Sequence, residues 1–113
     1  MAEEYIRVLL VEDNEEHAEL LQRMLIDSDN PIFEVAKFSA LRPALDALDL
    51  PGFQAVLLDL TLPDSEGIQT FLRMQAAAPD LPIVVLTGLD DEALAVETVQ
   101  RGAQDYLVKG RVD

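Results

Sequence analysis

The feature that most constrains the fold is a regular alternation between short apolar runs and segments with helical spacing. Strands are predicted for five runs, at Ile6–Val11, Phe33–Phe38, Ala55–Leu58, Ile83–Leu86 and Asp105–Val108. Strands separated by helical crossovers favour a parallel sheet with helices on both faces. We therefore predict an α/β protein with a doubly wound, five-stranded parallel sheet.

Helices are predicted between these runs from the spacing of apolar residues and from end signals. The first two cover Asn14–Asp27, with apolar residues at Ala18, Leu21 and Leu25, and Leu41–Leu48. The last two carry apolar residues at Ile68, Phe71, Leu72, and at Ala93, Val96, Val99. Asn14 can cap the first helix, and Asp90 or Asp91 can cap the last.

The composition limits the class of protein. The chain has 113 residues, 50% of them hydrophobic, which suits one domain over residues 1–113. There is no cysteine, which excludes disulfides and thiolate metal sites, and a net charge of −14 disfavours direct nucleic-acid binding. Met1–Arg7 lacks a basic leader, and no apolar run approaches the ~20 residues of a membrane span, so we expect a cytoplasmic protein away from membranes.

Polar side chains follow the ends of four predicted strands. In strand order they are Glu12 and Asp13, Asp59, Thr87 and Lys109. Because the carboxyl ends of parallel strands meet at one edge of a sheet, these side chains are predicted to converge. Each has an ordinary explanation when taken alone: an Asp is more often a helix cap, a Thr a β-former and a Lys a surface charge. Capping does not explain the whole set, which indicates a functional site.

Three acids in one pocket need a shared cation or raised pKa values. Two like charges ~4 Å apart repel by about 4 kcal/mol at an effective dielectric near 20. Mg²⁺ takes oxygen ligands, and a chain with one histidine and no cysteine cannot build a nitrogen- or sulfur-rich zinc site. That histidine, His17, is expected on the surface of the first helix rather than as a ligand.

A metal held by two acids beside a third acid suits phosphoryl transfer. The third carboxylate can attack phosphorus while the metal and an ammonium group neutralise the phosphoryl oxygens. Asp59 is the candidate nucleophile because it ends a central strand. Lys109 would supply the ammonium group, and Thr87 a hydrogen bond to a phosphoryl oxygen.

Four segments carry a family resemblance. They are Val8–Asn14, Asp59–Gly67, Leu86–Gly88 and Gly102–Lys109. In this order and spacing they resemble the receiver domains of two-component response regulators, from about Ile6 to Lys109. The resemblance implies a flavodoxin-like sheet with strand order 2-1-3-4-5. It also implies a signalling phosphoprotein that catalyses only its own phosphorylation and dephosphorylation, and that is not a metabolic enzyme.

The resemblance further implies roles for residues of the predicted site. Asp59 would be the phosphoacceptor, supplied by the phosphohistidine of a sensor kinase or a phosphotransfer protein. Asp13 would bind Mg²⁺ directly, Glu12 through water and Thr61 through its backbone carbonyl. The small Gly88 would leave room for the donor.

A switch is implied as well. The phosphoryl group would draw in the Thr87 hydroxyl, the ring of Tyr106 would turn inward, and the face formed by the fourth helix and fifth strand would change shape. Without the resemblance, Tyr106 would be interpreted as a half-buried aromatic residue on an edge strand. Thr61 and Leu89 flank the pocket and are expected to tune the phosphoryl lifetime. Output would come through another domain or another protein.

The sequence departs from the family pattern after Lys109. The family usually has proline there, in a cis peptide, whereas this chain has Gly110, and a cis bond before a non-proline residue costs ~2.5–4 kcal/mol. Gly110–Asp113 is also too short for the usual fifth helix, which is therefore predicted to be missing or truncated. We expect either a piece of a longer protein or a neighbouring chain, such as a homodimer partner, over the uncovered face.

Two other functions fit part of this pattern. A pseudo-receiver would use only the fold for binding, and it predicts damage to the acidic pocket or the lysine, which the sequence does not show. A phosphatase of the haloacid dehalogenase type also uses Asp, Mg²⁺, Thr and Lys. That class needs a second acid two residues after the nucleophile, where this chain has Thr61.

Overall fold

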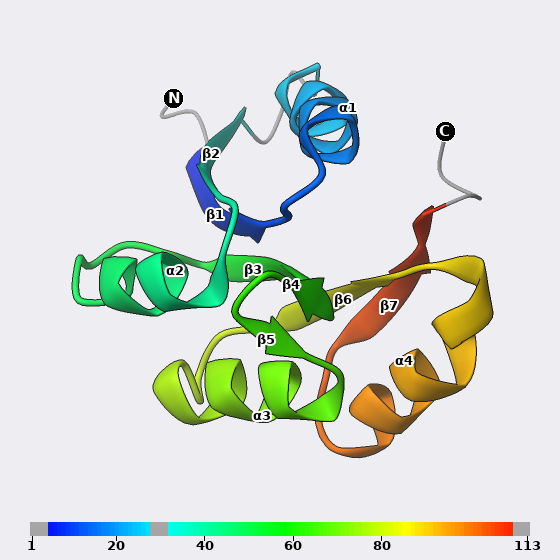
Figure 1. Cartoon of the computed structure of the whole chain (residues 1–113). Helices are drawn as coiled ribbons and strands as arrows, with labels where there is room; N and C mark the ends of the chain where they lie inside the picture. The colour runs from blue at the N-terminus through cyan, green and yellow to red at the C-terminus, as the bar shows by residue number, and fades with distance from the viewer. Residues whose placement is uncertain (1–4, 28–31, 110–113) are drawn as a thin grey trace.

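The computed structural model describes residues 5–27 and 32–109. Its main sheet is parallel, and its strands in spatial order are β2 (Ile32–Phe38), β1 (Tyr5–Val11), β3 (Ala55–Asp59), β6 (Ile83–Thr87) and β7 (Asp105–Val108). Numbered among themselves these strands run 2-1-3-4-5, so the predicted order is confirmed. The carboxyl ends of the three central strands therefore lie side by side (Figure 1).

The helices cover the two faces of the sheet unequally. Those of the described residues are α1 (Glu15–Ile26), α2 (Leu41–Ala47), α3 (Ile68–Ala77), the 3₁₀ turn η1 (Leu89–Asp91) and α4 (Glu92–Gln100). Figure 1 shows α1 on one face, with α2, α3 and α4 on the other. Among residues 5–27 and 32–109, α1 is the one helix on the first face, which therefore has less cover than the other.

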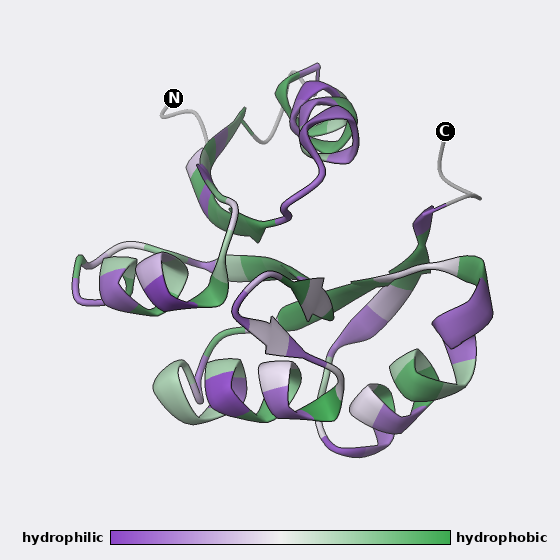
Figure 2. Cartoon of the chain, in the orientation of Figure 1, coloured by the Kyte–Doolittle hydropathy of each residue, from purple (hydrophilic) through white to green (hydrophobic). Residues whose placement is uncertain are grey.

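The core follows the two-residue period of the strands. Leu9 and Val11 of β1 face the larger cluster under α2, α3 and α4, whereas Leu10 faces a smaller cluster under α1. On the α1 face, Leu57 and Leu107 are only half-buried. Figure 2 shows hydrophobic strands at the centre and hydrophilic positions along the outer sides of the helices.

Helix α1 forms as its sequence predicts. The Asn14 side chain accepts a hydrogen bond from the backbone N–H of His17 at 3.0 Å and caps the helix, while Ala18 and Leu21 are buried. The predicted Asn14 cap is confirmed. Helix capping, the ordinary explanation for an Asp after a strand, therefore does not account for Asp13, because Asn14 occupies the N-cap position.

Helix α4 differs from its prediction in both its cap and its buried face. Asp91 stands at the N-cap position but makes no side-chain capping hydrogen bond. Val96 and Val99 are 40% and 38% exposed, whereas Ala95 and Thr98 are fully buried. Apolar residues occur on several sides of this helix, so their spacing does not identify the core face. The close packing of α4 favours the small side chains.

The predicted loop after β3 contains an antiparallel hairpin of two short strands, β4 (Thr61–Leu62) and β5 (Ser65–Glu66). The backbone N–H of Gly67 donates to the carbonyl of Leu60 at 2.7 Å and closes the base of the hairpin. Gly67 has φ +73°, a left-handed conformation that favours glycine at the entry to α3.

Some predictions lie outside the described residues. They concern the leader segment before Tyr5, the Lys109–Gly110 peptide and the missing helix after Gly110. Within residues 5–27 and 32–109, no helix has the length and apolar character that crossing a membrane requires.

Candidate functional site

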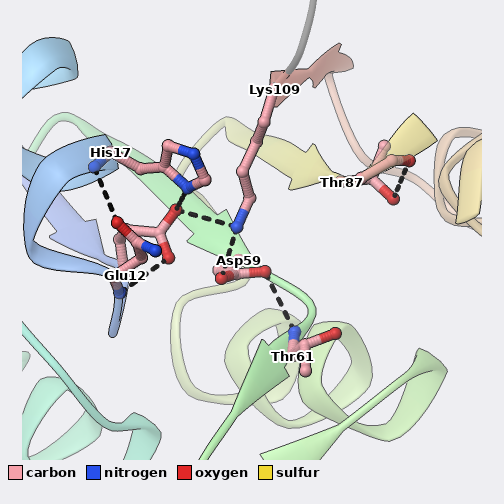
Figure 3. Close-up of polar contacts among 8 residues, drawn as sticks. Glu12, His17, Asp59, Thr61, Thr87 and Lys109 are labelled. Carbon is pink, nitrogen blue, oxygen red and sulfur yellow. Dashed lines mark hydrogen bonds and ion pairs between the residues drawn. The ribbon is translucent and has the colours of Figure 1, made fainter. Parts of the chain in front are cut away.

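The predicted polar residues gather at the carboxyl edge of the sheet. Glu12 follows β1, Asp59 ends β3 and Lys109 follows β7. Glu12 and Asp59 are each only 3% exposed, whereas Asp13 is exposed at the rim. Oxygen atoms from Glu12, Asp13 and Asp59, one from each, all lie within 4.8 Å of one another. The predicted convergence of the three acids is therefore observed, and Figure 3 shows two of them, Glu12 and Asp59.

Lys109 reaches into this acid cluster from the end of β7, an edge strand separated from β3 by β6. Its Nζ donates a hydrogen bond to Asp59 Oδ2 at 2.8 Å and lies 2.9 Å from Glu12 Oε1. Its side chain is 17% exposed. Burial alone would lower the pKa of Lys109, but the hydrogen bonds to Asp59 and Glu12 outweigh it and raise that pKa. The ammonium group is therefore held in its charged form between two carboxylates.

One ammonium group does not neutralise both buried acids. Burial, and then hydrogen bonding with Asp59, raises the pKa of Glu12 from 4.5 to about 7, although Lys109 acts in the opposite direction. Glu12 Oε1 is buried, and its ion-pair partner is Lys109 Nζ, 2.9 Å away. This oxygen-only donor set, with surplus negative charge, fits the preference of Mg²⁺ for carboxylate ligands.

We expect the metal-free protein to lose stability as the pH rises from 4.5 to about 7. In this window folded Glu12 retains a proton that the unfolded chain releases, so stability falls with rising pH. The shift corresponds to about 3 kcal/mol at most, at about 1.4 kcal/mol per pKa unit. Added Mg²⁺ should oppose the loss, because binding favours ionised Glu12. Urea unfolding with and without Mg²⁺ across the window measures both effects.

The Glu12→Gln variant is the matched control for this pH dependence. It keeps the side-chain shape but removes the titration, so its metal-free stability should no longer fall across the window in this way. An unchanged slope in the variant would contradict the assignment to Glu12. Asp64, whose pKa is lowered by the backbone N–H groups of Arg42 and Leu41, contributes stability that is lost only as pH falls below 3.8.

The two threonines that were predicted to belong to the site, Thr61 and Thr87, lie at the same edge of the sheet but make different contacts. The backbone N–H of Thr61 donates to Asp59 Oδ1 at 3.0 Å, which orients the Asp59 carboxylate. Thr87 is buried, and its hydroxyl is 3.4 Å from the carbonyl oxygen of Gly88, a long hydrogen bond within its own loop. Figure 3 shows Thr87 apart from the contacts that join Glu12, Asp59 and Lys109.

His17 stands beside the pocket, and its side chain is 41% exposed. Its Nδ1 lies 3.9 Å from Glu12 Oε1 and makes no hydrogen bond with a described residue. The half-exposed side chain agrees with the surface location that was expected for His17, although the pocket is closer than the sequence suggested.

Two acids with specific contacts near the site were missed. The Tyr106 hydroxyl donates to Glu92 Oε2 at 2.8 Å, which links β7 to the first turn of α4. The Asp64 carboxylate accepts hydrogen bonds from the backbone N–H groups of Leu41 and Arg42, both at 2.8 Å. The only sequence signal for the second contact was Ala40, which is a poor N-cap residue before α2.

Comparison with known proteins places this geometry among signalling regulators. The sequence model of one protein family, the response regulator receiver domain, matches residues 8–111 of this chain. The swarming motility regulation protein RssB of Serratia marcescens is 35% identical over 92% of this chain and 46% of its own length. The transcriptional regulatory protein ZraR of Escherichia coli K12 is 31% identical over 96% of this chain and 24% of its length. The chain thus spans less than half of each of these relatives.

Solved structures give the same result. The crystal structure of a putative response regulator from Chloroflexus aurantiacus has a TM-score of 0.81 at 27% identity, covering 95% of this chain and 87% of that one. Full-length FixJ from B. japonicum has a TM-score of 0.77 at 34% identity, covering 91% of this chain and 49% of FixJ.

Proposed function

Because the chain belongs to the family of response regulator receiver domains, we propose that Asp59 accepts a phosphoryl group from a phosphohistidine, with the help of Mg²⁺. The donor would be a sensor histidine kinase or a histidine phosphotransfer protein. The domain would then serve as a regulatory switch whose chemistry is limited to its own phosphorylation and dephosphorylation.

One observation carries this proposal. Carboxylate oxygens of Glu12, Asp13 and Asp59 lie within 4.8 Å of one another, and the Lys109 ammonium group binds Asp59 from the side. A pocket with this surplus of negative charge favours a divalent cation. A nucleophilic carboxylate beside fixed positive charge is suited to attack on phosphorus.

In the proposed step, a carboxylate oxygen of Asp59 forms a bond to phosphorus while the bond between phosphorus and the donor imidazole nitrogen breaks. The bonding electron pair leaves with that nitrogen, and the donor departs as neutral imidazole if its other ring nitrogen carries a proton. The Lys109 ammonium group and the Thr87 hydroxyl would stabilise the transferred phosphoryl oxygens. The exposed Gly88 leaves the approach open, since nothing lies within 4 Å of the position a Cβ would take there.

The metal would be held by residues of the same cluster. We assign Asp13 and Asp59 as direct ligands of Mg²⁺, Glu12 as a ligand through water, and the Thr61 backbone carbonyl as a further oxygen donor. When bound, Mg²⁺ supplies positive charge that offsets the repulsion between the carboxylates and the incoming phosphoryl group. The N–H of Thr61 already orients Asp59 without the metal.

The proposed switch couples this pocket to the face formed by α4 and β7. On phosphorylation the Thr87 hydroxyl would turn from the Gly88 carbonyl to the phosphoryl group, a movement favoured by the long 3.4 Å contact it leaves. Tyr106 would then turn inward, and its hydrogen bond to Glu92 would have to rearrange. Both changes would shift the equilibrium between two conformations of the loop after β6 and of β7.

Wild-type protein incubated with acetyl phosphate and Mg²⁺ is expected to gain one phosphoryl group. The adduct should withstand acid and be lost in base, as an acyl phosphate is, and intact-mass spectrometry measures it. Beryllofluoride, which mimics the phosphoryl group, should shift the amide NMR signals of Thr87, Tyr106 and Glu92 only when Mg²⁺ is present. An adduct that forms equally well in a chelator, or that survives base, would refute the proposal.

The partners follow from this assignment. A domain phosphorylated by a histidine kinase acts in the cytoplasm, which is the location we propose. The two curated relatives are regulators about two and about four times as long as this chain, and ZraR is named as a transcriptional regulator. We therefore propose that residues 1–113 form one receiver domain and that its output passes to another domain or protein, without direct nucleic-acid contact.

A further inference from the structure

Helix α2 receives its N-terminal cap from another part of the chain. Asp64 Oδ1 accepts from the N–H of Leu41 and Asp64 Oδ2 from the N–H of Arg42, both at 2.8 Å. Ala40, the N-cap residue itself, offers no side-chain hydrogen bond. The first N–H groups of a helix lack partners within the helix, and both oxygens of one carboxylate here satisfy two of them. The contact bridges 22 to 23 residues of sequence.

The same contact holds the tip of the hairpin that follows Asp59. The hairpin has two residues in each strand, a size at which an isolated hairpin is not stable. Its base is closed by the bond from Gly67 N–H to Leu60, and the side chain of Leu62 is buried in the core. Between Leu62 and β5, the Asp64 carboxylate ties the turn to α2.

We propose that Asp64 is a positioning residue for the phosphoacceptor site, an inference that rests on the proposed function. Asp64 would hold the hairpin against α2, and would thereby keep the Thr61 backbone beside Asp59. Thr61 is the link, because its N–H donates to Asp59 Oδ1 and its carbonyl is the metal donor proposed above. Asp64 touches none of the reacting groups, so its effect passes through the hairpin backbone.

The competing explanation is that Asp64 only stabilises α2, and a second substitution separates the two roles. Ala40 is extended, with φ −150° and ψ 160°, the conformation from which a serine side chain can cap a helix. Ala40→Ser should therefore give α2 a cap of its own when Asp64 is absent. The double variant Ala40→Ser/Asp64→Ala restores the cap of the helix but leaves the hairpin untied.

The test compares thermal midpoint, Mg²⁺ affinity by calorimetry and amide hydrogen exchange. In Asp64→Ala we expect the midpoint to fall by about 4–8 °C. We expect Mg²⁺ affinity to weaken by about tenfold, in the range seen when groups that orient metal ligands are removed. The amides of Thr61 and Gly67 should exchange faster. In the double variant the midpoint should recover, whereas Mg²⁺ affinity and hairpin exchange should stay as in Asp64→Ala.

A charge-matched control tests whether the loss of one negative charge, wherever it lies, is enough to change these measurements. Asp80→Ala deletes an exposed acid in the turn between α3 and β6, and it should leave all three measurements near wild type. The inference is overturned if the double variant regains wild-type Mg²⁺ affinity, or if Asp64→Ala never loses it. If wild-type protein binds no Mg²⁺, the proposed function fails instead. The exchange rates of Thr61 and Gly67 then still decide whether Asp64 holds the hairpin.

Discussion

The Asp59→Asn variant is expected to take up no phosphoryl group from acetyl phosphate under conditions that modify the wild-type domain. The amide is nearly the same size as the carboxylate but is a far weaker nucleophile, so the bond to phosphorus cannot form in its place. The fold should survive, because Lys109 keeps its ion pair with Glu12 at 2.9 Å. Removing the Asp59 charge also removes a cause of the raised pKa of Glu12, which should return toward its usual value.

Intact-mass spectrometry with base treatment measures the loss, and circular dichroism checks that the variant is folded. Asp90→Asn is the matched control, since it makes the same chemical change at an exposed residue of η1 and should label like the wild type. If Asp59→Asn acquires a base-labile phosphoryl group at the wild-type rate, another carboxylate is the acceptor, and the central assignment is wrong.

Much of the fold could be predicted because buried parallel strands have a strong sequence signal. Ala55–Leu58 and Ile83–Leu86 are uninterrupted apolar runs, as strands covered on both faces must be, and each lies within the observed β3 or β6. The order of the strands came from the family resemblance, because spacing alone does not fix it. The core face of α4 was ambiguous because Ala95 and Thr98 are buried while the more hydrophobic Val96 and Val99 are not.

The acid cluster could be predicted because topology alone brings strand ends together. Once the strands were assigned correctly, the parallel sheet required their carboxyl ends to meet at one edge, and with them Glu12, Asp59 and Lys109. The contacts of Asp64 and Glu92 depend on how loops are arranged against helices, which periodicity does not encode. Asp64 lies 23 residues from Leu41 in sequence and pairs with a backbone N–H, which every residue type except proline offers. Ala40 indicated only that α2 lacks a cap of its own, and no pattern of side chains identified Asp64 as the partner.

Replacement of Lys109 by methionine should slow phosphorylation by acetyl phosphate about 10²–10³-fold without abolishing Mg²⁺ binding. Methionine fills similar space but cannot stabilise charge on the phosphoryl oxygens, and removing one such donor typically costs this factor. The metal ligands we propose are oxygens of other residues. The variant lacks the ammonium group that lies 2.8 Å from Asp59 and 2.9 Å from Glu12 and competes with Mg²⁺ for those carboxylates. Mg²⁺ affinity should therefore be equal to or higher than that of the wild type.

The two effects of Lys109→Met are measured separately, by the initial rate of adduct formation and by calorimetric titration with Mg²⁺. Lys37→Met is the matched control, because Lys37 pairs with the exposed Glu15 at 3.8 Å and its loss changes the net charge equally. A wild-type labelling rate in Lys109→Met would reduce Lys109 to a counterion of the resting pocket. Loss of Mg²⁺ binding would instead show that the two buried carboxylates cannot hold their positions without the ammonium group. Slow labelling with intact Mg²⁺ affinity is the result that a direct role in stabilising the transferred phosphoryl group requires.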